Sequence, residues 1–532
     1  MRNLFIVFFI LWNIVMYSQE DAWVYFTNKP NAQYHLENPL TMLSQQAIDR
    51  RARQHIAIDE LDVPIHQEYI SELQAVNGIL IMAQSKWMNT VHVRGNPAII
   101  DQLSALDFVA RIEFANRSLN HSSRIQLPVA AREKFETLEN FQYGYASRQI
   151  EMLQGDKLHR QNYTGTGKVI AVLDNGFVGV NIAAPFQRLI QNNQILGGYD
   201  FVNRRSYFYG GGDHGTMVLS TMGAFEPEGL VGTAPDAQYY LFITEATAYE
   251  NPVEESYWVE AAEVADSLGV DVINTSLGYF QFDNPAYNYV FADMNGQKSF
   301  ISRGADIAYS RGMICVTSAG NSGNTSNPNI AVPADSQYTL TVGAVDATGT
   351  YAPFSSIGPT ADNRLKPDIV AQGVTAVVAT PSGALGGANG TSFSSPIVAG
   401  LVACLWQALP EATNAQIIQW VKESAHLYSN PNYQLGNGIP DFYQAYQSGL
   451  LTTNEPEIKS VILYPNPFDK ELYCLGLDST TIVEWYSLQG QKMMTSVIHN
   501  NNFITVPHLA SGIYIYKIIT EQQIYTGKII KK

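Results

Sequence analysis

Short apolar runs alternate with segments of helical periodicity between about residues 149 and 446. The runs are apolar almost throughout, and they span residues 168–174, 239–243, 270–274, 313–317 and 339–345. Segments 258–268 and 303–309 have helical spacing, and each leads directly into one of these runs. Strands buried on both faces that alternate with helices predict an α/β fold with a doubly wound, mostly parallel sheet.

A longer apolar run follows Gly390 and extends from Ser392 to Leu409. Its large residues recur at helical spacing and small residues occupy the opposite face, so the predicted helix is apolar nearly all round. Such a helix belongs in the core of a large domain. Ser392 lies in its first turn, at the positive end of the helix dipole. Serine is common as a helix N-cap, so capping alone is one interpretation of Ser392.

The same pattern divides the chain into three folded regions. Residues 19–118 combine helical segments with strand-like runs, which predicts a small α+β domain. The longest of its predicted helices spans residues 39–54. A predicted linker at 119–148 leads to the α/β domain at 149–449, and a second, polar linker follows at 450–458. Residues 459–532 contain short alternating runs separated by turns, which predicts an all-β sandwich.

The first 18 residues have the features of a signal peptide. Arg2 precedes a nearly unbroken apolar run at residues 4–17, and the small residue Ser18 follows at a plausible cleavage point. The run is shorter than the roughly 20 apolar residues that a membrane-spanning helix needs. We expect an exported protein, and we expect no transmembrane helix, because no later segment is apolar for 18 consecutive residues.

Charge and cysteine content exclude some classes of function. The net charge is -16, from 32 basic and 48 acidic residues, which argues against nucleic acid or an anionic membrane as the main partner. Cys315, Cys404 and Cys474 are an odd and widely spaced set, so they predict neither a disulfide framework nor a zinc site. Cys315 and Cys404 lie in apolar runs and are expected to be buried.

Four polar residues stand where predicted strands end or helices begin. Asp174 ends the first apolar run, Asn321 follows the run at 313–317, and His214 opens a predicted helix. In parallel sheets such positions meet beyond the carboxyl ends of the strands. Histidine titrates near neutrality, so His214 can accept the proton of Ser392 while Asp174 orients the imidazole. Asn321 and the backbone N–H of Ser392 can donate to an oxyanion.

Each of these residues has a simpler interpretation when it is taken alone. Asp174 can be a turn or cap acid, His214 an ordinary partly buried histidine, and Asn321 the occupant of a left-handed turn. Their combination favours chemistry. The chain order Asp, His, Ser is one of three that are found in serine hydrolase triads.

Five segments of the chain match one set of signature blocks: VIAVLDNGF, GGDHGTMV, INTSLG, SAGNSG and NGTSFSSP. Together they resemble the subtilisin-like (subtilase) serine peptidases over about residues 149–449. The resemblance implies a triad of Asp174, His214 and Ser392, with Asn321 as the oxyanion-hole side chain. It implies substrate-binding edges comprising Ser276, Leu277, Gly278, Ser318, Ala319 and Gly320. The implied activity is a serine endopeptidase that hydrolyses protein and peptide substrates through an acyl-enzyme and is made as a zymogen.

The chain departs from the family pattern at two positions. Phe393 follows the implied nucleophile where the family usually has methionine, and we expect this to change packing more than chemistry. Tyr279 stands where a second glycine is common, and it is expected to narrow or reshape the implied substrate pocket. The aromatic segment 280–300 that follows either extends this pocket wall or forms a surface loop.

The flanking regions also resemble known domains. Residues 19–118 look like a pro-domain that assists folding and blocks the cleft. The region 459–532, with the motifs LYPNPF and ASGIY, looks like the C-terminal sorting domain of the type IX secretion system of Bacteroidetes. The implied partners are the chain's own pro-domain and the secretion machinery, and the implied location is secreted or attached to the cell surface. A small ligand-binding β-module is the alternative for the last region.

Two other classes of function compete with this interpretation. One is a binding protein that uses an inactive peptidase fold. The other is a serine esterase or lipase, which would favour a Gly-x-Ser-x-Gly motif and the order Ser, Asp, His; this chain has neither. No cofactor is expected to be required. Calcium often stabilises the family, but no loop here is acidic enough to name ligands, so no metal-binding residue is predicted.

Overall fold

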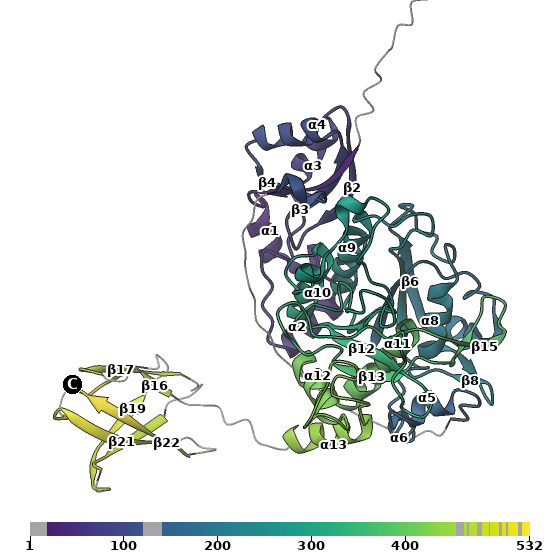
Figure 1. The fold of residues 1–532 in the computed structure, drawn as a ribbon. Helices are drawn as coiled ribbons and strands as arrows, with labels where there is room; N and C mark the ends of the chain where they lie inside the picture. Colours follow the sequence, from purple (N-terminus) through teal and green to yellow (C-terminus); the bar gives the residue numbers. More distant parts are fainter. Residues whose placement is uncertain are drawn as a thin grey trace, which may run out of the picture. The chain divides into compact units, whose positions relative to one another are not determined.

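The computed structural model describes residues 19–120, 141–453 and most of 462–532. The predicted signal segment 1–18 and most of the two predicted linkers, 119–148 and 450–458, lie outside the described residues. The chain forms two compact units, Met1–Leu451 and Thr452–Lys532 (Figure 1).

A parallel sheet of seven strands forms the centre of the first unit, in the order β13-β12-β11-β10-β5-β9-β6. Its strands are β5 (Val169–Asp174), β6 (Ile195–Asp200), β9 (Gln238–Ile243), β10 (Val272–Thr275), β11 (Ile314–Ser318), β12 (Leu340–Val345) and β13 (Ile369–Gln372). The predicted α/β fold is confirmed. Strands β6 and β13 were not predicted, and β6 contains Gly197 and Gly198, which disfavour strands.

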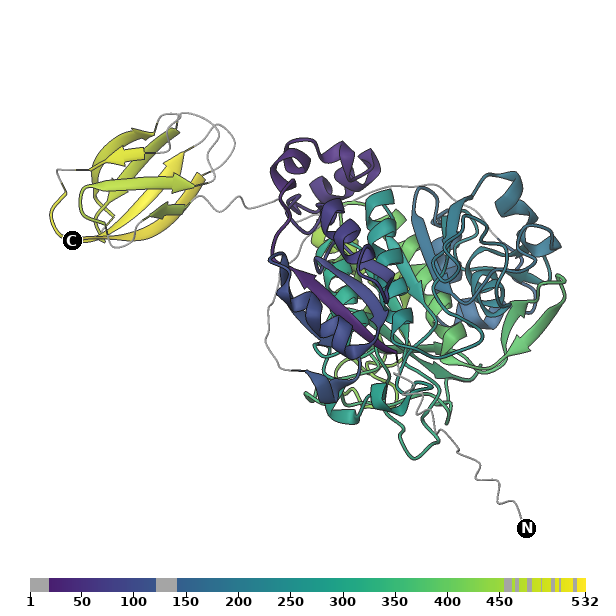
Figure 2. The same cartoon turned by 90° about the horizontal axis from the view of Figure 1, so that it is seen from above.

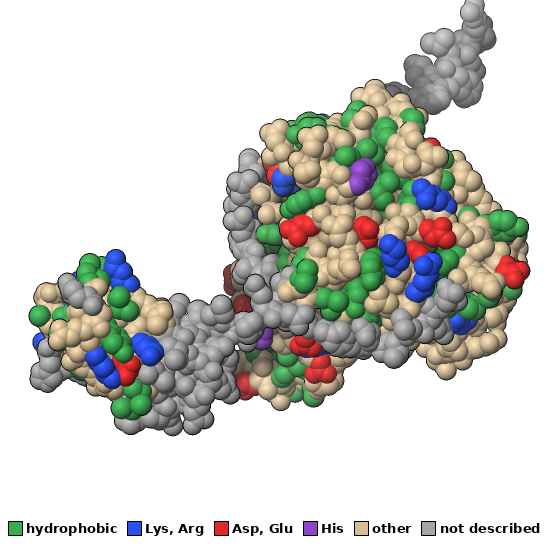
Figure 3. All heavy atoms as spheres, turned by 90° about the horizontal axis from the view of Figure 1, so that it is seen from below, with side chains coloured by type: hydrophobic (Ala, Val, Ile, Leu, Met, Phe, Trp, Pro, Cys, Tyr) green, Lys and Arg blue, Asp and Glu red, His purple; other side chains and the backbone are tan. Residues whose placement is uncertain are grey.

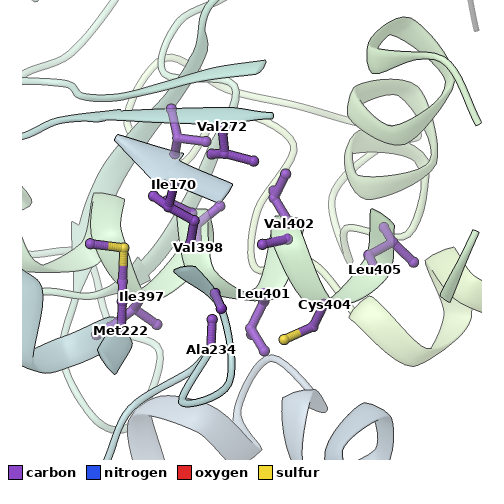
Figure 4. Close-up of a cluster of buried hydrophobic side chains, with 14 of the residues drawn as sticks. Ile170, Met222, Ala234, Val272, Ile397, Val398, Leu401, Val402, Cys404 and Leu405 are labelled. Carbon is purple, nitrogen blue, oxygen red and sulfur yellow. The ribbon is translucent and has the colours of Figure 1, made fainter. Parts of the chain in front are cut away.

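Helices cover both faces of this sheet. They are α8 (His214–Gly223) and α11 (Thr391–Ala408) on one face, with α9 (Val253–Leu268) and α10 (Phe300–Ser310) on the other. The side chains of neighbouring residues in β5 point to opposite faces of the sheet. Ile170 packs in the core beneath α11, and Ala171 packs in the core beneath α9. Figure 4 shows Ile170 and Val272 of the sheet against Val398 and Val402 of α11.

Helix α11 is buried on all sides, as its composition predicted. Val398, Leu401 and Val402 are completely shielded from solvent, and burial of one such side chain contributes about 1.5–3 kcal/mol. Among the described residues, α11 alone is long and apolar enough to cross a membrane, but 89% of its 18-residue window is buried inside the protein. It is therefore the central core helix of the sheet.

The N-terminal α+β domain contains an antiparallel sheet in the order β2-β3-β1-β4. Its strands are β1 (Glu20–Phe26), β2 (Ile79–Ser85), β3 (Thr90–Gly95) and β4 (Val109–Phe114), and its helices are α1 (Ala32–Glu37), α2 (Gln45–Arg53), α3 (Gln67–Gln74) and α4 (Pro97–Gln102). The single helix predicted at 39–54 is wrong. It divides into a 3-10 turn and α2, because the Ser44 hydroxyl caps α2 by accepting the Ala47 N–H at 3.1 Å.

This domain packs against α9 and α10 (Figures 1 and 2). The Trp23 indole N–H donates to Ser256 of α9 at 2.8 Å, and the Trp23 ring stacks on Phe300 of α10 with 5.1 Å between ring centroids. The Glu263 carboxylate of α9 accepts a hydrogen bond from the backbone N–H of Trp87 at 3.0 Å. The N-terminal domain therefore covers the helices on the outer face of the central sheet.

The remaining elements of the first unit are α5 (Ser147–Glu151), α6 (Gly155–His159), α7 (Gln187–Gln191), α12 (Asn414–Glu423), α13 (Phe442–Thr453), and the hairpins β7 (Phe225–Glu226) with β8 (Leu230–Val231) and β14 (Ala376–Ala379) with β15 (Leu385–Ala388). Cys315 and Cys404 are buried and free, as predicted.

The second unit consists of two antiparallel sheets, β16-β17-β20 and β19-β18-β21-β22. Their strands are β16 (Ile462–Tyr464), β17 (Glu471–Leu475), β18 (Thr481–Tyr486), β19 (Lys492–Ile498), β20 (Phe503–Thr505), β21 (Gly512–Ile519) and β22 (Ile524–Lys531). Leu472 of the first sheet and Trp485 and Ile518 of the second share one buried core. The two sheets therefore form the predicted β-sandwich.

Candidate active site

Asp174 is the last residue of β5 and His214 the first residue of α8, and their side chains are hydrogen-bonded. Imidazole Nδ1 lies 2.8 Å from Asp174 Oδ1. The Asp174 side chain is 2% exposed and that of His214 is 30% exposed, so a buried acid orients a ring that still reaches the surface. The carboxylate raises the pKa of His214 above its ordinary value, because its attraction for the imidazolium outweighs the opposing effect of burial.

The backbone around this pair holds both side chains in place. Asp174 Oδ1 also accepts the N–H of Asn175 at 2.8 Å. Gly215 follows His214, and a Cβ added there would lie 2.9 Å from the Asp174 Cβ and 2.5 Å from the Gly176 carbonyl oxygen. Only glycine at this position therefore lets the start of α8 approach the end of β5 so closely.

Ser392 is the second residue of α11. The N-cap position belongs to Gly390, with φ of 149°, so the interpretation of Ser392 as the helix N-cap is wrong. The aromatic ring of Phe393 lies with its centroid 5.8 Å from that of the His214 ring. The imidazole is therefore next to the first turn of α11, where Ser392 lies.

A buried polar network joins the end of β10 to the start of α11. The Ser395 hydroxyl donates to Asn274 Oδ1 at 3.1 Å, and Asn274 Nδ2 donates to Ser276 Oγ at 3.0 Å. The Ser276 hydroxyl in turn donates to the Ser392 carbonyl oxygen at 2.8 Å. Sequence reasoning missed this network. The signal that could have revealed it is the pair of polar side chains, Asn274 and Ser276, at the end of an apolar strand.

Asn321 lies in the loop after β11 and contacts the residue before Ser392. Its Oδ1 accepts two hydrogen bonds from Thr391, from the backbone N–H at 2.9 Å and from the hydroxyl at 3.0 Å. The Nδ2 group of Asn321 is therefore the part of this amide that can donate a hydrogen bond. The left-handed position in this loop is Gly320, with φ of 105°, so the interpretation of Asn321 as a left-handed turn residue is wrong.

The two predicted substrate edges follow two neighbouring strands of the sheet. Ser276, Leu277 and Gly278 follow β10, while Ser318, Ala319 and Gly320 end β11 or follow it. The edges are adjacent, because β10 and β11 pair in parallel with Thr275 opposite Thr317. The Gly320 N–H donates to the Thr391 hydroxyl at 3.2 Å, which ties the second edge to α11.

Tyr279 and the aromatic segment after it pack into the core on the α9 face. The Tyr279 ring is 1% exposed, and its hydroxyl donates to Glu245. Phe282, Tyr287 and Tyr289 belong to the same buried cluster. The interpretation of segment 280–300 as a mere surface loop is therefore wrong for these side chains.

Charged and metal-ligating side chains form no metal-binding group in the described part of the chain. Nowhere among the described residues do three or more His, Cys, Asp or Glu side chains come together as a metal-binding group. Acidic and basic side chains are interspersed on the face drawn in Figure 3.

Comparisons with known proteins identify the family of three regions of the chain. Residues 165–438 match the model of the subtilase family, residues 21–131 that of the peptidase S8 propeptide domain of Bacteroidota, and residues 462–532 that of the secretion system C-terminal sorting domain. Subtilisin DY of Bacillus licheniformis is 31% identical over 300 residues, which are 56% of this chain and 97% of that protein. Subtilisin E of Bacillus subtilis (strain 168) is 30% identical over 302 residues, which are 56% of this chain and 70% of that protein.

A solved structure shows a similar fold. The crystal structure of fervidolysin from Fervidobacterium pennivorans, a keratinolytic enzyme related to subtilisin, superposes with a TM-score of 0.54. Its sequence identity is 18%, and the match covers 94% of this chain and 71% of that one. At this identity the likeness concerns the fold alone.

The chain belongs to the subtilase family of serine peptidases. It is a subtilisin-like serine endopeptidase made as a zymogen, with an N-terminal pro-domain and a C-terminal domain that directs export by type IX secretion. The protein is therefore secreted or attached to the cell surface.

Proposed function

We propose that Asp174, His214 and Ser392 form the catalytic triad that hydrolyses peptide bonds in this enzyme. One observation carries the proposal. His214 Nδ1 is hydrogen-bonded to Asp174 at 2.8 Å, on a ring next to the first turn of α11. A hydrogen bond to Nδ1 fixes the tautomer in which Nε2 is free to act as a base.

Acylation begins when His214 Nε2 takes the proton of the Ser392 hydroxyl as Oγ bonds to the substrate carbonyl carbon. The carbonyl π electrons move to oxygen, and the resulting oxyanion accepts hydrogen bonds from Asn321 Nδ2 and the Ser392 N–H. The imidazolium then protonates the leaving nitrogen, the C–N bond breaks, and an acyl ester remains on Ser392. A water molecule that loses its proton to His214 hydrolyses this ester by the same steps.

The groups around the nucleophile support these roles. The N-terminus of α11 places the positive end of a long helix dipole where negative charge develops. The two substrate edges, 276–278 and 318–320, border Ser392 and Thr391 through the hydrogen bonds from Ser276 and Gly320. We propose that these edges bind the substrate backbone and that no cofactor takes part.

The order of the domains, with the pro-domain before the peptidase domain and the sorting domain after it, supports a maturation pathway in two cleavages. Removal of the signal peptide at residues 1–18 accompanies export, and the pro-domain inhibits the enzyme until it is cleaved off. Protein and peptide substrates then reach the site.

A fluorophosphonate probe tests the nucleophile directly, since it reacts with an activated serine hydroxyl. The processed enzyme should be labelled on the peptide that contains Ser392, and the Ser392→Ala protein should not be labelled. Equal labelling of the two proteins would falsify the assignment. Ser394→Ala is the matched control, because Ser394 lies two residues away and its hydroxyl is bonded to the Thr391 carbonyl oxygen.

A further inference from the structure

Arg117 of the pro-domain is held by the peptidase domain through four contacts. Its Nη1 lies 2.5 Å from Asp293 Oδ2 and donates to the Asn288 carbonyl oxygen at 3.2 Å. Its Nη2 donates to the Tyr287 carbonyl oxygen at 3.3 Å. The guanidinium carbon lies 4.0 Å from the centroid of the Tyr289 ring, which is a cation–π contact.

The groups that bind Arg117 belong to the peptidase domain, and contacts within that domain hold three of them. The Val290 N–H donates to Asp293 Oδ2 at 2.9 Å, which fixes the carboxylate. The Tyr289 hydroxyl donates to the buried Glu255 at 2.6 Å, which fixes the ring. Asn288 is held by the Phe282 N–H, which its side chain accepts at 2.7 Å. Contacts within the peptidase domain therefore hold Asp293, Tyr289 and Asn288, whereas the Tyr287 hydroxyl donates to Glu20 of the pro-domain at 3.0 Å.

The composition of the site selects arginine over lysine. A carboxylate and two carbonyl oxygens accept hydrogen bonds from different nitrogens of one planar group, and an aromatic face covers that plane. A guanidinium has several N–H donors in a fixed plane and stacks on rings, whereas an ammonium is a compact point charge.

The site adjoins the first of the two substrate edges, residues 276–278. Tyr289 donates its N–H to the Phe280 carbonyl oxygen at 3.0 Å, and Phe280 lies two residues beyond Gly278. Ser276, at the other end of this edge, is bonded to the Ser392 carbonyl oxygen. Three residues lie between Ser276 and Phe280, so the Cα atoms of these two residues are at most about 14 Å apart. A substrate in extended conformation covers such a distance with about four residues.

Arg117 also lies close to the end of the described pro-domain, three residues after β4 ends at Phe114. The pro-domain chain thus reaches the guanidinium site just before its connection to the peptidase domain. An arginine that precedes a cleaved bond in a substrate can occupy the same place once the pro-domain has left.

We propose that Tyr287, Asn288, Tyr289 and Asp293 form a guanidinium-binding subsite that recognises an arginine of the substrate on the N-terminal side of the cleaved bond, and that Arg117 occupies it in the zymogen. This inference rests on the proposed peptidase function and adds a specificity to it.

Steady-state hydrolysis of a peptide series tests the subsite. A single arginine is moved from the second to the sixth residue before the cleaved bond, and each peptide has a partner with citrulline, which keeps the shape and removes the charge. At one position arginine should raise kcat/KM about 10-fold to 100-fold over citrulline, as expected for charge-assisted hydrogen bonds. Asp293→Asn should bring this ratio close to one, and Asp283→Asn, in the same segment, should leave it unchanged.

A binding measurement separates this inference from the proposed catalysis. Analogues of the best peptide pair with a reduced, uncleavable bond are bound to the processed enzyme and followed by fluorescence anisotropy. Tighter binding of the arginine analogue, lost in Asp293→Asn, supports the subsite whether or not the triad is correct. Equal binding and equal hydrolysis of arginine and citrulline peptides at all five positions overturns it.

Discussion

Arg51 of the pro-domain and Asp266 of the peptidase domain form an ion pair that is closed to solvent, with 2.7 Å between Nη2 and Oδ2. The same guanidinium binds Asp62 of the pro-domain at 2.6 Å, and Arg50 binds the other oxygen of Asp266. Asp266 lies in the last turn of α9, where the helix dipole also favours cations. Since β10 begins soon after, this contact lies at the end of the sheet opposite to Asp174.

Replacing Arg51 should therefore destabilise the zymogen. In the full chain with Ser392→Ala, which keeps the pro-domain attached, Arg51→Met removes the guanidinium that binds two buried carboxylates, and it leaves Asp266 with Arg50 and Asp62 with the more distant Arg311 at 3.8 Å. We expect a loss of about 3–5 kcal/mol in the free energy of unfolding, measured by urea denaturation. Arg51→Lys should recover part of this loss. Arg53→Met is the control, because Arg53 is exposed and its guanidinium donates to the Asp49 carbonyl oxygen of its own helix. Equal stability of the Arg51→Met and Arg53→Met proteins would contradict the role of the ion pair.

Asn321 should act through its N–H donor and not only through its contact with Thr391. Asn321→Asp keeps an oxygen that can accept the two hydrogen bonds from Thr391 but removes the amide donor. We expect kcat to fall about 10²-fold to 10³-fold in both Asn321→Asp and Asn321→Ala, with a small change in KM.

Thr391→Val is the matched control for this test. It keeps the backbone N–H and removes the hydroxyl, which donates to Asn321 and accepts the Gly320 N–H, so kcat should fall less than about 30-fold, the typical worth of two neutral hydrogen bonds. If Asn321→Asp retains the activity of the unmodified enzyme, the oxyanion role of Asn321 is wrong.

The sequence predicted five of the seven strands of the central sheet and the pairing of Asp174 with His214 because both depend on local signals. Buried parallel strands are continuous apolar runs, and polar residues at their carboxyl ends converge at one edge. The split of the helix predicted at 39–54 was missed, since it depends on a single cap at Ser44. The contacts of Arg51 and Arg117 could not be predicted either. They join residues 215 and 176 positions apart, and no periodicity in the chain specifies such pairs.

Chelation should have little effect on stability. The described residues bring together no group of three or more acidic or histidine side chains that could hold a metal ion. We expect the melting temperature of the processed enzyme to change by less than about 2 °C when EDTA is added, because loss of a ligand in excess over its Kd would lower stability by more than this. A larger fall that added calcium reverses would show that backbone carbonyl oxygens or residues outside the described ranges bind the ion.

The pH dependence of activity should report the titration of His214. The carboxylate of Asp174 raises the pKa of His214, and the base must be neutral in the free enzyme. Activity is therefore low while the imidazole is protonated, and kcat/KM should increase as the pH rises through this raised pKa. Asp174→Asn removes the attraction for the imidazolium, so the remaining activity should rise at a lower pH, and kcat should fall about 10⁴-fold because the tautomer is no longer fixed.

Asp213→Asn is the control for this shift. Asp213 also raises the pKa of His214 but is the smallest of the named causes, and its side chain is not hydrogen-bonded to the imidazole in the way that Asp174 is. The profile should therefore move slightly in the same direction while kcat stays within a few-fold of the unmodified enzyme. A rate that is flat between about pH 5 and 8 would rule out His214 as the base, since a histidine that acts as the base must change its charge near this range.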